Sequence, residues 1–364
     1  MFKQKIRKNI FILITLFLLH CSSAAAQYEQ IQFATGVSAF DVWDKDELLL
    51  GDASGNLALF NMRTKQEFSF HNKGERVISL AKIPGQRRAL VSFASGMVAL
   101  FRYDGKILKR ECIVVSIFRK HFIVRAIKIS PDGRFAIFYP DQFTKKSELP
   151  EVWDLENNSM IFRLQKKINI NTSVITPDSN CVIVHDDSGI ISWYRLSDGC
   201  LQNWIDVNYI YGQPSKKGFI GYKDIINLDF LKNRSVLIIT TSSGNILKID
   251  LSQKLHAVCS KFDGIDSLDT MIPLQINNNN DFFIGSHSLF FENQLILFNA
   301  KKREIIECPT SESIKTIKML NGRLPVTLLE DGKLIGWIFN CLLSKKFVFD
   351  SNNLEQAFAR LDLE

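Results

Sequence analysis

Long amphipathic helical patterns are missing from this sequence of 364 residues. Its apolar residues recur instead in short alternating runs separated by Asp, Ser, Gly and Asn, which predicts an all-β chain and excludes helical bundles. Catalytic motifs are missing as well, because the sequence contains no nucleophile elbow, phosphate loop, dinucleotide fingerprint or HExxH. We therefore expect no catalytic residue and a protein that is not an enzyme.

Histidine is scarce, and no two cysteines form a CxxC motif. A structural zinc site needs clustered His and Cys ligands, so we expect neither a metal nor a cofactor. Beyond the N-terminal 26 residues, six cysteines leave open 15 complete disulfide pairings, and Cys181 could equally be a single buried thiol. These six are Cys112, Cys181, Cys200, Cys259, Cys308 and Cys341.

The N-terminal apolar run is too short to cross a membrane. It covers the ten residues from Ile10 to Leu19, whereas a bilayer span needs about 20. Basic residues precede it and CSSAAAQ follows, which is the three-part form of a secretory signal. We expect residues 1–26 to be a signal peptide cleaved after Ala26, and the protein to be periplasmic or secreted. The alternative is a lipoprotein acylated at Cys21, although the bulky His20 occupies a place where such signals have Gly or Ala.

The net charge of +7 comes largely from this leader. Without its four basic residues, 41 basic residues face 38 acidic ones, a difference of +3. This excess is too small to argue for a nucleic-acid partner. The remaining basic runs are expected to be solvated loop ends: Lys145-Lys146, Lys166-Lys167, Lys216-Lys217 and Lys301-Lys302-Arg303.

One short phrase returns along the chain, with a glycine at its fifth position followed by alternating apolar residues. Its copies are GDASGNLALF (51–60), SFASGMVALF (92–101), HDDSGIISWY (185–194), TTSSGNILKI (240–249) and LLEDGKLIGW (328–337). Two of the intervals are close to twice a unit of about 45 residues, and each contains one further copy, at 124–164 and 272–308. Seven units result.

Each unit divides into four short strands, as in VSAFDVW, ELLLGD, LALFNM and QEFSF of the first. The repeated glycine lies between the second and third strands, where a two-residue hairpin turn needs positive φ. Acidic residues cluster at turns, where Asx hydrogen bonds explain them, as at Asp52, Asp132, Asp187 and Asp331. The sequence predicts a seven-bladed β-propeller of four-stranded blades at about 35–72, 75–112, 122–165, 172–206, 223–260, 267–308 and 314–350.

One unit resembles a WD40-type repeat. Ser130-Pro131-Asp132-Gly133 matches the first turn of that repeat, and Trp153-Asp154 matches the dipeptide that closes its third strand. The Gly-His pair of the family is missing throughout. The resemblance therefore implies a divergent, WD40-like propeller, and quinoprotein-like or YVTN-type propellers are a looser match.

A propeller ring needs a strand that closes it, because an open ring leaves unpaired sheet edges. YEQIQFA (28–34) and KKFVFD (345–350) could both supply it, and we predict that the first pairs into the seventh blade. The propeller is expected to cover residues 27–350, with a tail at 351–364. Apolar side chains should pack between the blades, among them Phe60, Phe101, Trp193 and Trp337.

Three departures from the repeat predict a binding face. They are the loop 139–151, the connection 207–223 and the loop 285–294. Second-to-third strand loops and blade-to-blade connections emerge on the same rim of a propeller, so their aromatic and basic residues should gather on one surface. The predicted binding residues are Phe143, Lys145, Lys146, Tyr209, Tyr211, Lys216, Lys217, Phe290 and Phe291, with Phe219 nearby.

These observations favour a non-catalytic protein-interaction propeller, a monomeric scaffold that binds a protein or peptide on the face with the long loops. One alternative is a propeller enzyme, such as a metal-dependent, lactonase-like hydrolase with its metal in the channel. Another is a lipoprotein propeller of envelope assembly.

Overall fold

The structure is a computed structural model. It describes residues 28–339 apart from 35, 65, 71–73, 116–122, 141–148, 165–167, 187–189, 207–224, 231–235, 242–244, 252–255, 262–269, 275–281, 290–291, 300–303 and 321–323. All regular elements in these ranges are β-strands. No helix among them has the length and apolar composition needed to cross a bilayer.

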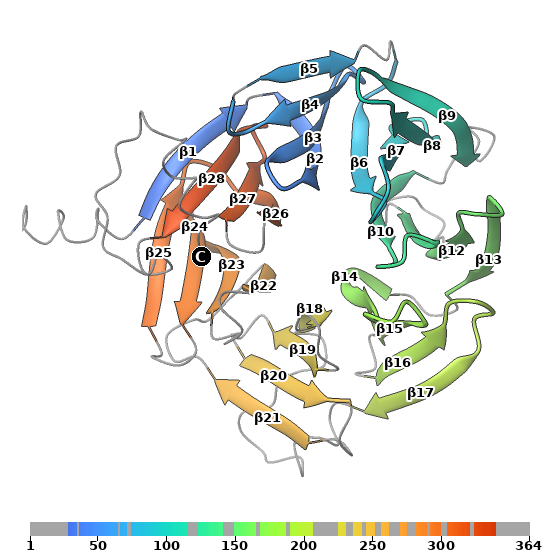
Figure 1. Ribbon diagram of the computed structural model, residues 1–364. Helices are drawn as coiled ribbons and strands as arrows, with labels where there is room; N and C mark the ends of the chain where they lie inside the picture. The colour runs from blue at the N-terminus through green and yellow to red at the C-terminus, as the bar shows by residue number, and fades with distance from the viewer. Residues whose placement is uncertain are drawn as a thin grey trace, which may run out of the picture.

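The described strands form seven four-stranded antiparallel sheets arranged as a ring (Figure 1). Six sheets follow the chain from the innermost strand outward, and their bounds agree with the predicted units to within a few residues. They are β2 (Val37–Asp44), β3 (Glu47–Asp52), β4 (Leu57–Asn61) and β5 (Glu67–Phe70); β6 (Val77–Lys82), β7 (Arg88–Phe93), β8 (Val98–Tyr103) and β9 (Leu108–Val115); β10 (Val124–Ile129), β11 (Phe135–Pro140), β12 (Glu151–Asp154) and β13 (Ser159–Arg163); β14 (Ile168–Ile175), β15 (Cys181–Asp186), β16 (Ile190–Arg195) and β17 (Leu201–Asp206); β18 (Ile225–Phe230), β19 (Val236–Thr241), β20 (Asn245–Asp250) and β21 (His256–Lys261); and β22 (Thr270–Leu274), β23 (Phe282–Leu289), β24 (Glu292–Asn299) and β25 (Glu304–Thr310). The predicted all-β propeller class is confirmed.

The seventh sheet joins the two ends of the described chain. It contains β26 (Ile314–Leu320), β27 (Leu324–Leu329) and β28 (Leu334–Phe339), and its outermost strand is β1 (Tyr28–Ala34). β1 runs antiparallel to β28 from the pair Tyr28↔Phe339 to the pair Ala34↔Leu334. The two strands lie side by side in Figure 1. The predicted closure by the N-terminal segment is confirmed, whereas the other candidate, 345–350, lies outside the described residues.

One loop predicted in the sixth sheet is instead mostly β-strand. Residues 285–294 were expected to form an enlarged loop, but β23 continues to Leu289 and β24 begins at Glu292. The pairing continues from Gly285↔Ile296 to Leu289↔Glu292. No proline interrupts this stretch, so the ladder of backbone hydrogen bonds can extend almost to the tip of the hairpin.

The core consists of apolar layers between neighbouring blades. The four aromatic residues predicted to lie there are all buried: Phe60, Phe101, Trp193 and Trp337. Phe60, for example, packs in a cluster that joins the first and seventh sheets, and Trp193 in one that joins the fourth and fifth. Stability therefore comes from contacts between blades rather than from one central core.

Three of the repeated glycines, Gly55, Gly96 and Gly332, lie in three-residue turns, so the predicted two-residue turn is wrong at these positions. In the first blade Asp52 N donates to Asn56 O (3.1 Å), and Gly55, with φ of 86°, closes the turn. Gly96 and Gly332 close equivalent turns, with φ of 87° and 82°. A three-residue hairpin loop needs a left-handed residue at its last position, so glycine is still required.

Close approach to the next blade is a second reason for glycine at position 55. A Cβ atom there would lie 2.7 Å from Glu75 O, on the connection into the second blade. We expect Gly55→Ala to lower the free energy of unfolding by about 2–4 kcal/mol, because it adds a backbone clash to the strain of positive φ. Gly85→Ala is the matched control, since Gly85 has φ of 69° but nothing within 4 Å of the added Cβ. Equal losses in denaturant unfolding would show that the clash does not matter.

Turn aspartates accept backbone hydrogen bonds, as predicted. Asp52 Oδ1 accepts from Ser54 N and Asn56 N, both at 2.8 Å. Asp132 Oδ1 accepts from Arg134 N (3.0 Å), and Asp331 Oδ1 from Lys333 N (3.0 Å). Asp187 lies outside the described residues.

The WD40-like unit has its own hydrogen-bond network. Asp154 receives the backbone N–H of Glu156 (2.9 Å) and of Asn157 (3.1 Å), and thereby orders the turn after the third strand. The indole of Trp153 donates to the buried carboxylate of Glu151 (3.0 Å), which also accepts from Arg163 Nε (3.1 Å). The Trp153-Asp154 dipeptide thus has a structural role, and the carboxylate of Glu151 on the same strand holds the indole of Trp153.

Candidate binding site

The predicted binding residues lie outside the part of the chain that the structure describes. Phe143, Lys145 and Lys146 belong to the connection between β11 and β12, and the two Tyr, Phe219 and the two Lys of 207–224 to that between β17 and β18. Phe290 and Phe291 are the two residues that separate β23 from β24 in the sequence. The insertion-bearing face therefore stays a prediction.

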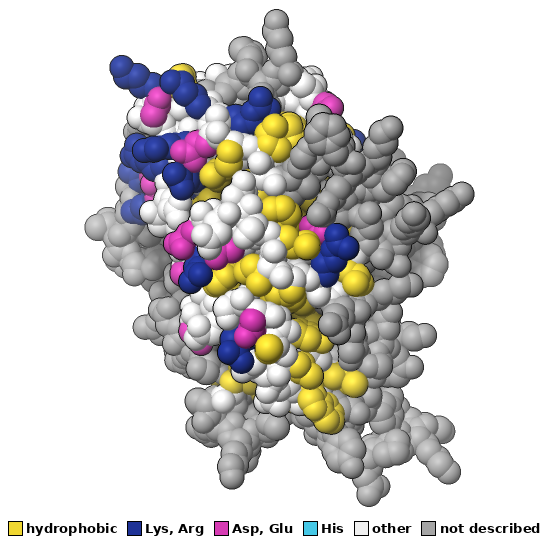
Figure 2. Space-filling model, turned by 90° about the vertical axis from the view of Figure 1, so that its right-hand side faces the viewer, with side chains coloured by type: hydrophobic (Ala, Val, Ile, Leu, Met, Phe, Trp, Pro, Cys, Tyr) yellow, Lys and Arg dark blue, Asp and Glu magenta, His cyan; other side chains and the backbone are white. Residues whose placement is uncertain are grey.

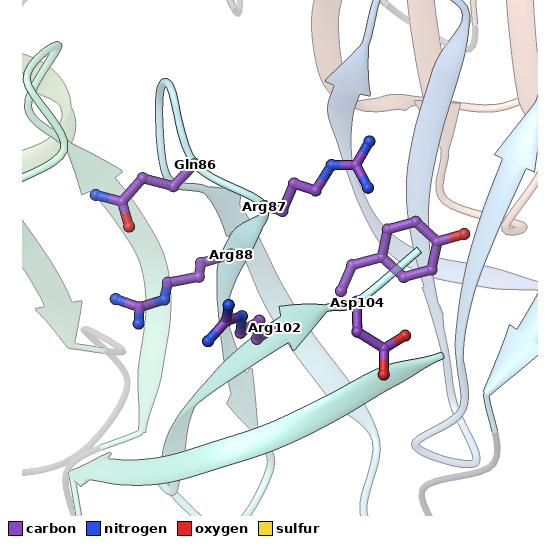
Figure 3. A pocket seen from close by; sticks show the side chains of 6 residues that line it. Gln86, Arg87, Arg88, Arg102 and Asp104 are labelled. Carbon is purple, nitrogen blue, oxygen red and sulfur yellow. The ribbon is translucent and has the colours of Figure 1, made fainter. Parts of the chain in front are cut away.

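The described residues form a pocket on the opposite rim of the ring, in the second blade. Turns between the first and second strands share this rim with turns between the third and fourth, and the pocket lies where two such turns meet. It has a volume of about 450 Å³ and is lined by Gln86, Arg87, Arg88, Arg102, Tyr103 and Asp104 (Figure 3). We call it the arginine pocket.

Backbone hydrogen bonds fix both turns of the arginine pocket. In the first turn Ile83 N donates to Arg88 O (2.9 Å), and Gln86 N donates to Ile83 O (3.2 Å). Tyr103 N donates to Arg87 O (2.9 Å), which ties the second turn to the first. The arginines therefore project from a rigid frame rather than from a long loop.

Asp104 orders the second turn. Its Oδ1 accepts from the backbone N–H of Lys106 and of Ile107, both at 2.9 Å. These hydrogen bonds, Ile107 first, and the charge of Lys109 hold the pKa of Asp104 below its ordinary value. Asp104 is therefore an ionised turn residue at neutral pH.

Two of the three arginines share one carboxylate. Arg88 Nε lies 3.0 Å from Glu111 Oε2, and Arg102 Nη1 lies 3.6 Å from Glu111 Oε1. Figure 3 shows that Arg88 and Arg102 extend to one side of the pocket and Arg87 to the other. One acid between two guanidinium groups leaves an excess of positive charge on that side.

Arg87 has a different environment. Its guanidinium carbon lies 6.0 Å from the centre of the Tyr103 ring, and it makes no ion pair with any residue that the structure describes. The Tyr103 hydroxyl donates to Gly105 O (3.0 Å), which holds the ring in place. A guanidinium positioned over an aromatic ring is a ready partner for a carboxylate or phosphate, which it can bind with two parallel hydrogen bonds.

The innermost strands carry a second set of charges. Asp41, Lys128, Asp229 and Lys318 occupy equivalent positions, each following a register shift near the start of its strand. Asp41 Oδ1 lies 3.3 Å from Lys318 Nζ, and its Oδ2 accepts from the backbone N–H of Lys82 (2.9 Å). One carboxylate therefore connects the first blade to the second and seventh.

Lys128 and Asp229 lie partly buried on the innermost strands of the third and fifth blades. Burial lowers the pKa of Lys128 to about 8, against the attraction of Asp229. Burial also raises the pKa of Asp229 to about 6, against a hydrogen bond from Phe230 N and the charge of Lys128. Among the described residues, no three His, Cys, Asp or Glu side chains come together as metal ligands would.

The raised pKa of Asp229 predicts a pH effect on stability. Because its pKa is higher folded than unfolded, the neutral carboxyl stabilises the fold fully below about pH 4, and this contribution is lost as the pH rises through about 6. Asp229→Asn mimics the neutral form, so it should gain about 1–3 kcal/mol relative to wild type between pH 4 and pH 7. Urea unfolding at both pH values measures the gain. Asp44→Asn, a substitution at an exposed position, is the control. If the free energy of unfolding of Asp229→Asn differed from that of wild type by the same amount at both pH values, the prediction would be contradicted.

Cys112, Cys181 and Cys200 are free thiols in the structure. Cys112 and Cys200 are exposed, Cys308 is buried, and Cys181 is partly buried. Burial raises the pKa of the Cys181 thiol, as expected for a small core residue. The disulfide alternative therefore does not apply to Cys112, Cys181 and Cys200.

No protein-family model matches the sequence, and no curated protein is similar to it. Among solved structures, the fold is similar to the β-propeller domain of Cps50 (Swd1) from Myceliophteria thermophila, with a TM-score of 0.62. The two chains are 13% identical, and the similarity covers 85% of this chain and 98% of that one. At this identity the likeness shows the fold alone, which is a β-propeller.

Proposed function

We propose that this protein is a non-catalytic interaction propeller, a rigid seven-bladed scaffold that binds a protein partner. The arginine pocket is the observation that carries the proposal. It presents Arg87 over an aromatic ring with no ion pair among the described residues, and its lining contains three arginines but one carboxylate, Asp104, while Arg88 and Arg102 share Glu111. An acidic side chain or a terminal carboxylate of a partner is the group that this arrangement recognises.

The frame of the pocket supports a binding role. Its volume of about 450 Å³ falls within the range of about 300–1,000 Å³ of ligand pockets. Because sheet turns fix the backbone from which the arginines project, little loop entropy is lost when a partner binds. The similarity to another β-propeller supports a scaffold role only through the shared fold.

Two further elements belong to the proposal. Residues 1–26 direct export, so that the propeller of 27–350 works in the cell envelope or outside the cell. The insertion-bearing face, with Phe143, Tyr209, Tyr211, Lys216 and the other predicted residues, supplies a second contact on the opposite rim.

Affinity capture of the exported protein, with quantitative mass spectrometry, tests the proposal. Wild type should recover a partner, and Arg87→Ala should reduce its recovery by about tenfold, the loss expected for one charged hydrogen-bonded contact. Lys106→Ala is the matched control, since Lys106 is an exposed cation in the adjoining turn. A partner kept by Arg87→Ala would exclude the arginine pocket. Stoichiometric metal and hydrolysis of a lactone by the purified protein would exclude a non-catalytic role.

Combined replacement of Tyr209, Tyr211 and Lys216 by alanine tests the second contact separately. Loss of the partner in this variant, with retention in Arg87→Ala, would place the binding site on the insertion-bearing face alone.

A further inference from the structure

Exposed apolar side chains gather on the outer wall of three consecutive blades. The large apolar residues that are exposed in the described part of the chain are Ile107, Ile113, Met160, Leu201 and Trp204, with exposed fractions from 38% to 58%. All of them lie on or beside the outermost strands β9, β13 and β17. We call these five residues the wall band.

Figure 2 shows this wall from the side of β9, β13 and β17. Apolar side chains run along it as a nearly continuous band, and Lys and Arg side chains gather beside one end. The arginine pocket and the cations Lys109 and Arg110 belong to the same blade as Ile107 and Ile113. Apolar and cationic surface therefore adjoin on the second blade.

The wall also presents sheet edges. β9, β13 and β17 are each the last strand of their sheet and pair on one side only among the described strands. Natural proteins usually protect such edges with charged residues. β17 lacks this protection at Leu201-Gln202-Asn203-Trp204, four consecutive exposed and uncharged residues.

The curvature of the wall decides which kind of partner fits. A ring of seven blades turns by roughly 50° from one blade to the next, so Ile113 and Trp204, two blades apart, face directions roughly 100° apart. A flat bilayer or a rigid globular surface cannot contact both at once. An extended polypeptide can follow the curve, because its backbone bends and its side chains reach successive blades.

We propose that the wall band binds an extended segment of a partner polypeptide, whose apolar residues cover Met160, Leu201 and Trp204 and whose acidic residues reach the arginine pocket. This inference rests on the proposed function, since the same partner occupies the pocket. The open edge of β17 can add hydrogen bonds to the backbone of the segment, as in strand addition. The exposed Trp204 supplies the large anchor that such interfaces usually contain.

Selection from a displayed library of random peptides of about twelve residues tests this inference, since a strand of that length spans about 40 Å. The bait is the purified mature protein. Enriched peptides should alternate apolar residues and carry Asp or Glu towards one end. Their dissociation constants should rise at least about tenfold with Leu201→Ser combined with Trp204→Ser, and also with Arg87→Ala. Ser69→Ala, on the outermost strand of the first blade, should leave binding unchanged.

Several results would overturn the inference. These are a selection without enriched peptides, peptides that bind the double variant as tightly as wild type, and peptides without acidic enrichment. Sedimentation with phosphatidylglycerol vesicles that depends on Trp204 would assign the wall band to a membrane. Self-association that the double variant abolishes would assign it to a second copy of the chain.

The captured partner separates this inference from the proposed function. If the double variant keeps the partner and Arg87→Ala loses it, the wall band is not the binding surface but the proposed function stands. If both variants keep it, the arginine pocket fails as the binding site.

Discussion

Replacing Trp337 with alanine is expected to lower the free energy of unfolding by about 3–5 kcal/mol. Trp337 is fully buried and packs between the sixth and seventh sheets against Leu295, Leu297 and Cys308. Its indole N–H also donates to Thr327 Oγ1 at 2.9 Å. The substitution therefore removes a large apolar surface, leaves a cavity and takes a hydrogen-bond donor from a buried hydroxyl.

Equilibrium unfolding in guanidinium chloride measures this loss. Trp204→Ala is the matched control, because Trp204 is 58% exposed on the outer wall and its loss should cost less than about 1 kcal/mol. Trp337→Phe should fall between the two, since it keeps an aromatic ring but not the N–H. Similar losses for Trp337→Ala and Trp204→Ala would contradict the packing between the sixth and seventh sheets.

Deletion of residues 28–34 is expected to open the ring. The deletion removes β1 from β28 and exposes the backbone of Leu334–Phe339 as an unpaired edge. We expect a loss of several kcal/mol in the free energy of unfolding, a lower melting temperature and concentration-dependent aggregation. Thermal unfolding and size-exclusion chromatography measure these effects. Rescue by the free peptide YEQIQFA would show that pairing with β28 is what the deletion removes.

Gln30→Ala is the control for this deletion. Gln30 is exposed and its side chain donates to Pro309 O at 3.4 Å, so the substitution changes a surface contact and keeps the backbone pairing. It should cost less than about 1 kcal/mol. An unchanged melting temperature after deletion of 28–34 would mean that another segment closes the seventh sheet.

The fold could be predicted largely because its signals are local and repeated. Turn glycines such as Gly55 and Gly96 mark the middle of each blade, and alternating apolar residues mark the strands beside them. The second blade was predicted at 75–112 and its strands span Val77–Val115. In the fourth blade, β14 begins at Ile168, before the predicted 172, because its first residues alternate with asparagine and read as a polar loop.

The errors arise where the pairing of strands, rather than the residue composition, determines the length of a turn or strand. The two-residue turn at Gly55 was wrong because the register of β3 with β4 adds one residue to the loop. The segment 285–294 was read as a loop because its polar residues hide the pairing of β23 with β24. Neither register can be deduced from one sequence alone.

The arginine pocket was missed because it combines two turns that are distant in sequence. Arg87-Arg88 and Arg102-Tyr103 come together only through the pairing of β7 with β8. One signal was available, since both turns belong to the same rim and both carry arginine. The longest insertions occur on the opposite rim, so the predicted binding face fell there.

Closure by β1 also affects the order in which the protein can fold. A ribosome makes Tyr28–Ala34 near the start of synthesis and its partner Leu334–Phe339 some 300 residues later. Such a distant pairing forms late, since about 300 residues of chain must be brought together first. The six sheets between can assemble in order as they emerge, but a product that stops before residue 334 leaves β1 without its partner strand and β27 paired with β26 alone. Such shortened chains should be prime targets for proteases, so that complete synthesis is itself a condition for a durable ring.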